Sequence, residues 1–206
     1  YQYKENVSEV DIAQAFINFP IAAYLSQQGF FVLHASCVSK NDKTLLFIGK
    51  SHAGKSTLAY AFKKYGWEII TEDIAVIEPT TFEIKLSHPY VKLSLEARDY
   101  FNLHGKKSIK LNSDKREGHV FKRLLNKNKL ITDVFVLGWG DKSQIKNLEN
   151  KDAIKSLMDF SFSTSHEATA NYIFKTITQK KTFHLEMKKE FDCLDKIVRI
   201  VSEKVF

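Results

Sequence analysis

The residues best suited to chemistry form one continuous run, Gly49-Lys50-Ser51-His52-Ala53-Gly54-Lys55-Ser56-Thr57. This run, here named the glycine loop, fits the pattern G-x-x-x-x-G-K-[ST], whose glycines let backbone N–H groups turn toward phosphate oxygens. In this pattern Lys55 contacts the β- and γ-phosphates of a nucleotide, and the Ser56 hydroxyl binds Mg²⁺. An ordinary glycine turn is the alternative, but the chain has only 8 glycines and two stand at the required positions. We therefore predict a site for ATP or another nucleotide with Mg²⁺.

The segments before and after the glycine loop suit that role. Residues 44–48 are apolar and predict a strand, and residues 56–65 are rich in helix formers and predict a helix. Residues 30–38 predict an earlier strand, and the polar residues 40–43 predict the turn of a hairpin. In such a hairpin, His34 would lie near the glycine loop.

Two adjacent acids, Glu72 and Asp73, interrupt an apolar stretch between strands predicted for residues 67–71 and 74–77. A sheet could return them to the glycine loop, where one carboxylate would hold Mg²⁺ and the other would take a proton from an attacking hydroxyl. A solvated acidic turn is the alternative, but the apolar residues on both sides count against it.

The remaining sequence predicts further short strands and helices. We expect strands at residues 82–86, 131–137 and 182–187. We expect a short helix capped by Ser94 and longer helices at residues 11–28 (interrupted near Pro20), 152–160, 167–178 and 191–205. Residues 103–129 predict lysine-rich loops around a weak strand or two. The many short strands in hairpin connection predict an α/β fold with a mixed, largely antiparallel sheet and flanking helices. We expect one domain, residues 1–206, with an N-terminal helical segment at residues 1–29.

Composition limits the setting and the partners. The net charge of +7 comes from lysines spread along the chain, which suits an anionic ligand or an acidic partner. Neither a dense basic block nor an aromatic stacking platform indicates nucleic acid. Cys37 and Cys193 are too few for a disulfide framework, and no apolar run is long enough for a membrane span, so we expect a cytoplasmic protein without membrane contact. The sequence leaves the oligomeric state open.

The order of His34, the glycine loop and Glu72-Asp73 resembles the catalytic domain of HPr kinase/phosphorylase. The resemblance is strongest to small HPr-kinase-like proteins found with ribosomally made peptides, including lasso peptides. Three segments carry it: Leu33-His34-Ala35-Ser36 is similar to their Leu-His-Ala-Ser, Pro89-Tyr90-Val91-Lys92-Leu93 to their Pro-x-x-(Arg/Lys)-Leu, and Lys115-Arg116 to a following Lys-Arg. It runs from about residue 30 to the C-terminus and implies a P-loop kinase core of the HPr kinase type.

The resemblance also implies roles for single residues. Asp73 would be the base that activates an acceptor hydroxyl, and Glu72 with Ser56 would form the Mg²⁺ environment. His34 would lie close to the transferred phosphoryl group, and Lys55 would neutralise charge that develops on it.

Four positions qualify this picture. Glu72 stands where the family usually has Asp, and His52 is unusual inside the loop and would face solvent. Lys115 and Arg116 would grip phosphate or an acidic peptide, although a charged loop is more often simply solvated.

Together these features predict an ATP- and Mg²⁺-dependent kinase that phosphorylates a serine hydroxyl of a protein or peptide, such as the C-terminal serine of a precursor peptide. A small-molecule kinase or an NTPase that uses water as acceptor is one alternative. A nucleotide-dependent binding or regulatory module with weakened catalysis is another, and the Glu72 departure is consistent with it.

Overall fold

The computed structural model describes residues 9, 12–13, 16, 19–85, 90–110, 116–121, 127–162 and 166–206. Its elements in chain order are α2 (Phe19–Gln27), β1 (Phe31–Lys40), β2 (Lys43–Ile48), α3 (Lys55–Lys64), β3 (Glu68–Thr71), β4 (Ile74–Ile77), β5 (Glu83–Ile84), β6 (Tyr90–Leu93), α4 (Leu95–Tyr100), β7 (Ser108–Lys110), β8 (Glu117–Val120), β9 (Lys129–Leu130), β10 (Asp133–Trp139), β11 (Gln144–Asn147), α5 (Asn150–Asp159), α6 (His166–Gln179), β12 (Lys181–Met187), a 3₁₀ turn (Phe191–Cys193) and α7 (Leu194–Val205). Within these described ranges, no helix is both long and apolar enough to cross a membrane.

The large sheet has nine strands in the order β11-β12-β10-β2-β1-β4-β5-β9, and β3 also pairs with β1. Strand β10 runs parallel to both β2 and β12, whereas the other pairs are antiparallel. A separate sheet of three antiparallel strands has the order β6-β8-β7. The α/β class and the mixed, largely antiparallel sheet that the sequence predicts are therefore confirmed.

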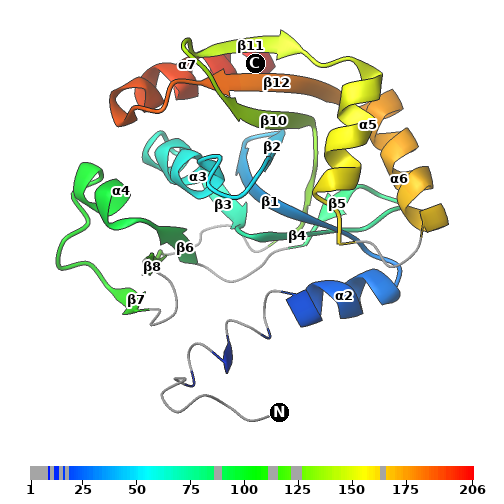
Figure 1. Ribbon diagram of the computed structural model, residues 1–206, viewed down its shortest axis with the longest axis horizontal. Helices are drawn as coiled ribbons and strands as arrows, with labels where there is room; N and C mark the ends of the chain where they lie inside the picture. The colour runs from blue at the N-terminus through cyan, green and yellow to red at the C-terminus, as the bar shows by residue number, and fades with distance from the viewer. Residues whose placement is uncertain are drawn as a thin grey trace.

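Helices cover both faces of the large sheet (Figure 1). The alternation of side chains along β2 shows why: Leu45 and Phe47 belong to the core that includes α3 and α7, whereas Leu46 and Ile48 belong to the core that includes α5 and α6. All four side chains are at most 1% exposed. Burial of each stabilises the fold by roughly 1.5–3 kcal/mol, which fixes this strand and hence the position of the loop that follows it.

Strand β1 is an interior strand, and its neighbours on both sides place the residues of the candidate site. Along one side it forms the predicted hairpin with β2, ending at the pair Ala35↔Ile48, one residue before the glycine loop. Along its other side its first half pairs with β4, through His34↔Ile74, and its second half pairs with β3, from Cys37↔Thr71. The two acids thus lie in the break between β3 and β4, directly beside His34.

Two local expectations differ from the structure, whereas the expected helix around Pro20 does not. The described residues 12, 13 and 16 are helical, and α2 begins at Phe19 with Pro20 in its first turn, where a missing N–H leaves no hydrogen bond unmade. The returning strand is only the two residues of β5, within the expected 82–86 segment. Strand β11 was not predicted, because it is an edge strand whose side chains are half-buried or exposed and show no alternation.

Candidate functional site

The glycine loop connects β2 to α3 through a tight backbone path. Gly54 precedes α3 with φ 85°, in the left-handed region that favours glycine. Gly49 has a different constraint, because a Cβ there would lie 3.1 Å from the Leu137 carbonyl oxygen of β10. Among the described residues no side chain caps the start of α3, so its first N–H groups and positive dipole end suit an anion.

Lys55 is buried at the base of the loop, with 6% of its surface exposed. Its Nζ donates hydrogen bonds to the carbonyl oxygens of Gly49, at 2.8 Å, and Lys50, at 3.0 Å. Burial lowers the pKa of Lys55 to about 8, although the nearby carboxylates of Asp73 and Glu72 oppose that shift. The ammonium group is therefore fixed in place, and a further negative charge beside it would favour its charged form.

The half-buried Ser56 and the buried Glu72 form a hydrogen-bonded pair at the loop. The Ser56 hydroxyl donates to Glu72 Oε1, and Glu72 is 1% exposed. Burial, and then the charge of Asp73, raise the pKa of Glu72 to about 8. The second oxygen, Oε2, has no hydrogen-bond partner within the described part of the chain.

An unpaired, buried carboxylate oxygen beside a serine hydroxyl fits a hard, oxygen-preferring cation such as Mg²⁺, which commonly binds one or two protein oxygens and completes its shell with phosphates and water. Ser56 lines the cavity described below and Glu72 does not. Ser56 is therefore the better placed of the two to contact such a cation, and Glu72 orients its hydroxyl.

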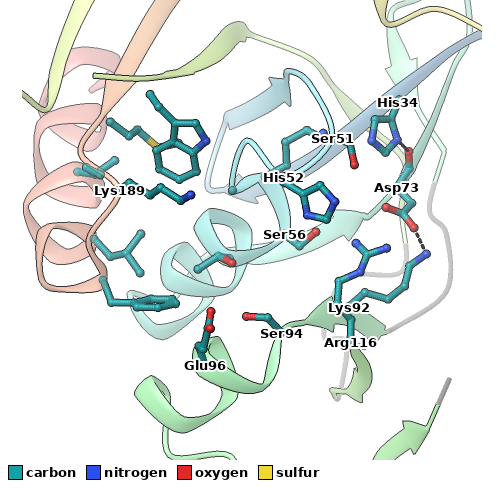
Figure 2. A pocket seen from close by; sticks show the side chains of 18 of the residues that line it. His34, Ser51, His52, Ser56, Asp73, Lys92, Ser94, Glu96, Arg116 and Lys189 are labelled. Atoms are coloured by element: carbon teal, nitrogen blue, oxygen red, sulfur yellow. Dashed lines mark hydrogen bonds and ion pairs between the residues drawn. The ribbon is translucent and has the colours of Figure 1, made fainter. Parts of the chain in front are cut away.

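Asp73 is held from two sides. Its carboxylate forms an ion pair through Oδ2 with Nζ of Lys92, which comes from β6 of the small sheet and is 4% exposed. Its carbonyl oxygen accepts from Nδ1 of His34, at 3.0 Å, and from the backbone N–H of Ala35, at 3.2 Å. The residue has φ 66°, an uncommon conformation for a side-chain-bearing residue. The surrounding contacts stabilise this backbone, which turns the carboxylate toward Lys92 (Figure 2).

His34 is oriented by the same contact. A carbonyl oxygen only accepts, so Nδ1 carries the proton and Nε2 is left as an acceptor in the neutral ring. Burial first, and then the positive charge of Lys55, lower the pKa of His34. The imidazole is therefore neutral at pH 7, with its lone pair on Nε2.

Lys92 is the residue of this site to which the sequence analysis gave no role. Burial opposes its charged form, but the carboxylates of Asp73 and Glu72 outweigh burial and raise the pKa of Lys92. One feature of the sequence could have pointed to this role: Lys92 stands inside the apolar run of β6, and a buried charge needs a partner of opposite charge. The pattern alone did not say that this partner is Asp73, in another sheet.

One cavity, of about 740 Å³, brings most of the predicted residues together. Its lining includes His34, Ser51, His52, Gly54, Lys55, Ser56, Thr57, Asp73, Lys92 and Arg116. Figure 2 shows His34, Asp73, Lys92 and Arg116 on one side of the glycine loop. His52 is exposed, as expected, and has φ 62°.

The other predicted residues lie elsewhere. Lys50 is exposed and contributes its carbonyl oxygen, which accepts from Lys55 and from the N–H of Ala53. Ala53 is buried and Gly49 packs against β10, so both shape the loop from behind. Lys115 lies outside the described residues.

The comparisons with known proteins give a distant likeness. No family model and no curated protein matches the chain. Among solved structures, the chain is similar to the HPr(Ser) kinase/phosphatase from Coxiella burnetii, with 9% sequence identity and a TM-score of 0.40 over 84% of this chain and 95% of that one. The chemistry open to the site follows from its own side chains: anion binding at the start of α3, cation binding at Ser56, and proton transfer at Asp73 or His34.

Proposed function

We propose that the protein is an ATP- and Mg²⁺-dependent kinase that transfers the γ-phosphoryl group to a serine hydroxyl of a protein or peptide. The observation that carries this proposal is one cavity in which the glycine loop, with its fixed Lys55, meets the oriented carboxylate of Asp73. A nucleotide-binding module without catalysis would not need that carboxylate. The peptide class rests on the family resemblance of the sequence motifs.

The transfer proceeds by in-line displacement at the γ-phosphorus. The serine oxygen bonds to phosphorus as the bond from phosphorus to the β,γ-bridging oxygen breaks, and ADP leaves. Asp73 accepts the hydroxyl proton, while Lys92 holds the other side of its carboxylate in place. Lys55 lies beside the phosphates and offsets the charge that develops on them.

A Mg²⁺ ion held through Ser56, with Glu72 behind it, would neutralise charge on the β- and γ-phosphates. His34 lies next to Asp73 and presents a neutral ring, so it lines the acceptor side of the site without adding positive charge there.

The test compares Asp73→Asn with the wild type and with Asp99→Asn, an exposed acid outside the cavity. Purified proteins are incubated with Mg²⁺, ATP labelled in the γ-phosphoryl group and serine-containing peptides. We expect Asp73→Asn to lower transfer by roughly 10²–10⁴-fold, the usual contribution of a general base, while nucleotide binding persists. Asp99→Asn should behave as the wild type. Equal transfer by wild type and Asp73→Asn would rule out the proposed base.

The same incubation separates the other acceptors. Phosphate release that is independent of peptide would indicate an NTPase, and labelling of an added small alcohol instead of peptide would indicate a small-molecule kinase. Nucleotide binding without turnover under any condition would indicate a regulatory module.

A further inference from the structure

The cavity continues past the glycine loop, away from Asp73, into a second part. Its lining there combines the charged side chains Lys188, Lys189 and Glu190 with five apolar ones, Trp139, Met187, Phe191, Leu194 and Ile197. Trp139 is 45% exposed although it is one of the largest apolar side chains of the protein. Figure 2 shows Lys189, of the same part, on the opposite side of the loop from His34 and Asp73. The His34 end also has an apolar side chain, Phe162, whose ring centroid lies 6.4 Å from that of His34, so the feature that distinguishes the Trp139 end is the large, exposed indole beside the glycine loop.

Sheet register explains why the Trp139 end adjoins the loop. Parallel strands β2 and β10 pair through Val136↔Ile48, so β10 continues beyond the point where β2 enters the loop. Parallel strands β10 and β12 end together at the pair Trp139↔Met187. Both side chains reach the last glycine of the loop: a Cβ on Gly54 would lie 3.1 Å from Trp139 Cη2 and 3.6 Å from Met187 Cε.

We propose that the Trp139 end is the nucleobase subsite, in which the Trp139 indole stacks on the base of the nucleoside triphosphate and Met187 and Phe191 contact its edges. The inference rests on the proposed function, since it assumes that the glycine loop holds the triphosphate. A base is a flat, polarisable ring attached to a polyanion, so it needs an aromatic or apolar surface next to an anion site. Trp139 beside the start of α3 provides that combination.

The assignment also divides the cavity between two substrates. With the base on the Trp139 side, the γ-phosphoryl group points toward Asp73, His34 and Lys92. The acceptor then enters from the side of His34 and Arg116, away from the nucleobase.

The experiment measures calorimetric affinities for two probes, Mg-ATP and Mg-tripolyphosphate, which has the phosphates without the base. Trp139→Ala is compared with Trp139→Phe, which keeps an aromatic ring, and with Tyr65→Ala, which removes an aromatic side chain of equal exposure, 45%, outside the cavity. We expect Trp139→Ala to weaken Mg-ATP binding about 10-fold, as loss of a base stack does, and to leave tripolyphosphate within about 2-fold. Trp139→Phe should recover most of the ATP affinity, and Tyr65→Ala should change neither.

A second measurement uses fluorescence. The chain has two tryptophans, and Trp67 is buried between Phe62 and Phe206. In Trp67→Phe, emission comes from Trp139 alone, and we expect Mg-ATP but not tripolyphosphate to quench it.

The possible outcomes separate this inference from the function on which it rests. Unchanged ATP affinity in Trp139→Ala would overturn the subsite. An equal loss of affinity for Mg-ATP and for Mg-tripolyphosphate would also overturn it, because Trp139 would then only support Gly54. A wild-type protein that binds neither probe would overturn the proposed function and the subsite with it.

Discussion

At the scale of single residues, the ion pair between Asp73 and Lys92 holds in place the carboxylate that we propose as the base. Both charges are largely removed from water, and each is the other's partner across two sheets. A buried pair is a weak source of net stability, but losing one member leaves an uncompensated charge.

We therefore predict that Lys92→Met lowers the free energy of unfolding by about 3–5 kcal/mol, because it leaves the Asp73 carboxylate unpaired. Combining it with Asp73→Asn should restore a large part of that loss. Urea denaturation of the two single variants, the double variant and the wild type measures this coupling. Additive effects in the double variant would show that the two side chains do not interact.

Glu72 gives a prediction for pH. Its pKa is raised by burial from 4.5 to about 8, so between these values the folded protein holds a proton that the unfolded chain has released. The resulting stabilisation is fully present below pH 4.5 and is lost as pH rises through 8. With Mg²⁺ chelated, the unfolding free energy of the wild type should fall relative to that of Glu72→Gln between pH 5 and pH 8. Parallel pH profiles of the two proteins would contradict a protonated Glu72.

The predicted residues that the structure brings together are those with a local sequence signal. The glycine loop is a spacing pattern, and the two acids stand out because apolar residues flank them on both sides. Lys92 was not assigned, since its partner is 19 residues away and lies in another sheet. Trp139 was not assigned either, because its place beside Gly54 depends on the strand order.

At the scale of elements, the turn from the glycine loop into α3 joins two requirements at Gly54. The position needs a left-handed backbone, and it needs space for Trp139. Either requirement alone favours glycine.

We predict that Gly54→Ala is more harmful than a matched change at Gly29. Both residues have left-handed φ, 85° and 90°, so both variants carry a backbone cost of roughly 1–2 kcal/mol. A Cβ at Gly29 meets nothing within 4 Å, whereas one at Gly54 meets Trp139. Thermal unfolding and nucleotide affinity measure the difference. Equal stability loss and equal ATP affinity in the two variants would show that the contact with Trp139 is unimportant.

Elements were predictable where each has its own pattern. The β1–β2 hairpin and the strands on either side of the acids followed from apolar runs and a polar turn. Strand β11 was not predictable, because an edge strand is defined by its pairing with β12 and not by alternation of its side chains.

At the scale of the whole molecule, the site draws on both sheets and on the loop between β2 and α3. The class of fold followed from many short strands, but the strand order did not, because the parallel pairing of β10 joins segments far apart in the sequence. A ligand that bridges such distant segments should stabilise the whole structure.

We predict that saturating Mg-ATP raises the melting temperature by about 5–10 °C. A ligand at 100 times its Kd adds about 2.7 kcal/mol, and each kcal/mol shifts the melting temperature of a chain this size by about 2–4 °C. Chelating Mg²⁺ should reduce the shift in melting temperature, because the γ-phosphate then lacks the cation that we propose at Ser56. Calorimetry with ATP, with Mg-ATP and without nucleotide measures both effects, and an identical shift with and without Mg²⁺ would argue against a cation at Ser56.

The most direct test of the central claim follows the labelled γ-phosphoryl group to its destination. Wild-type protein is incubated with labelled Mg-ATP and a serine-containing peptide, and the peptide is then analysed by mass spectrometry. We predict that the label appears as a phosphate ester on serine, with one ADP formed for each phosphate transferred. Recovery of all the label as inorganic phosphate, at a rate that peptide does not change, would contradict it.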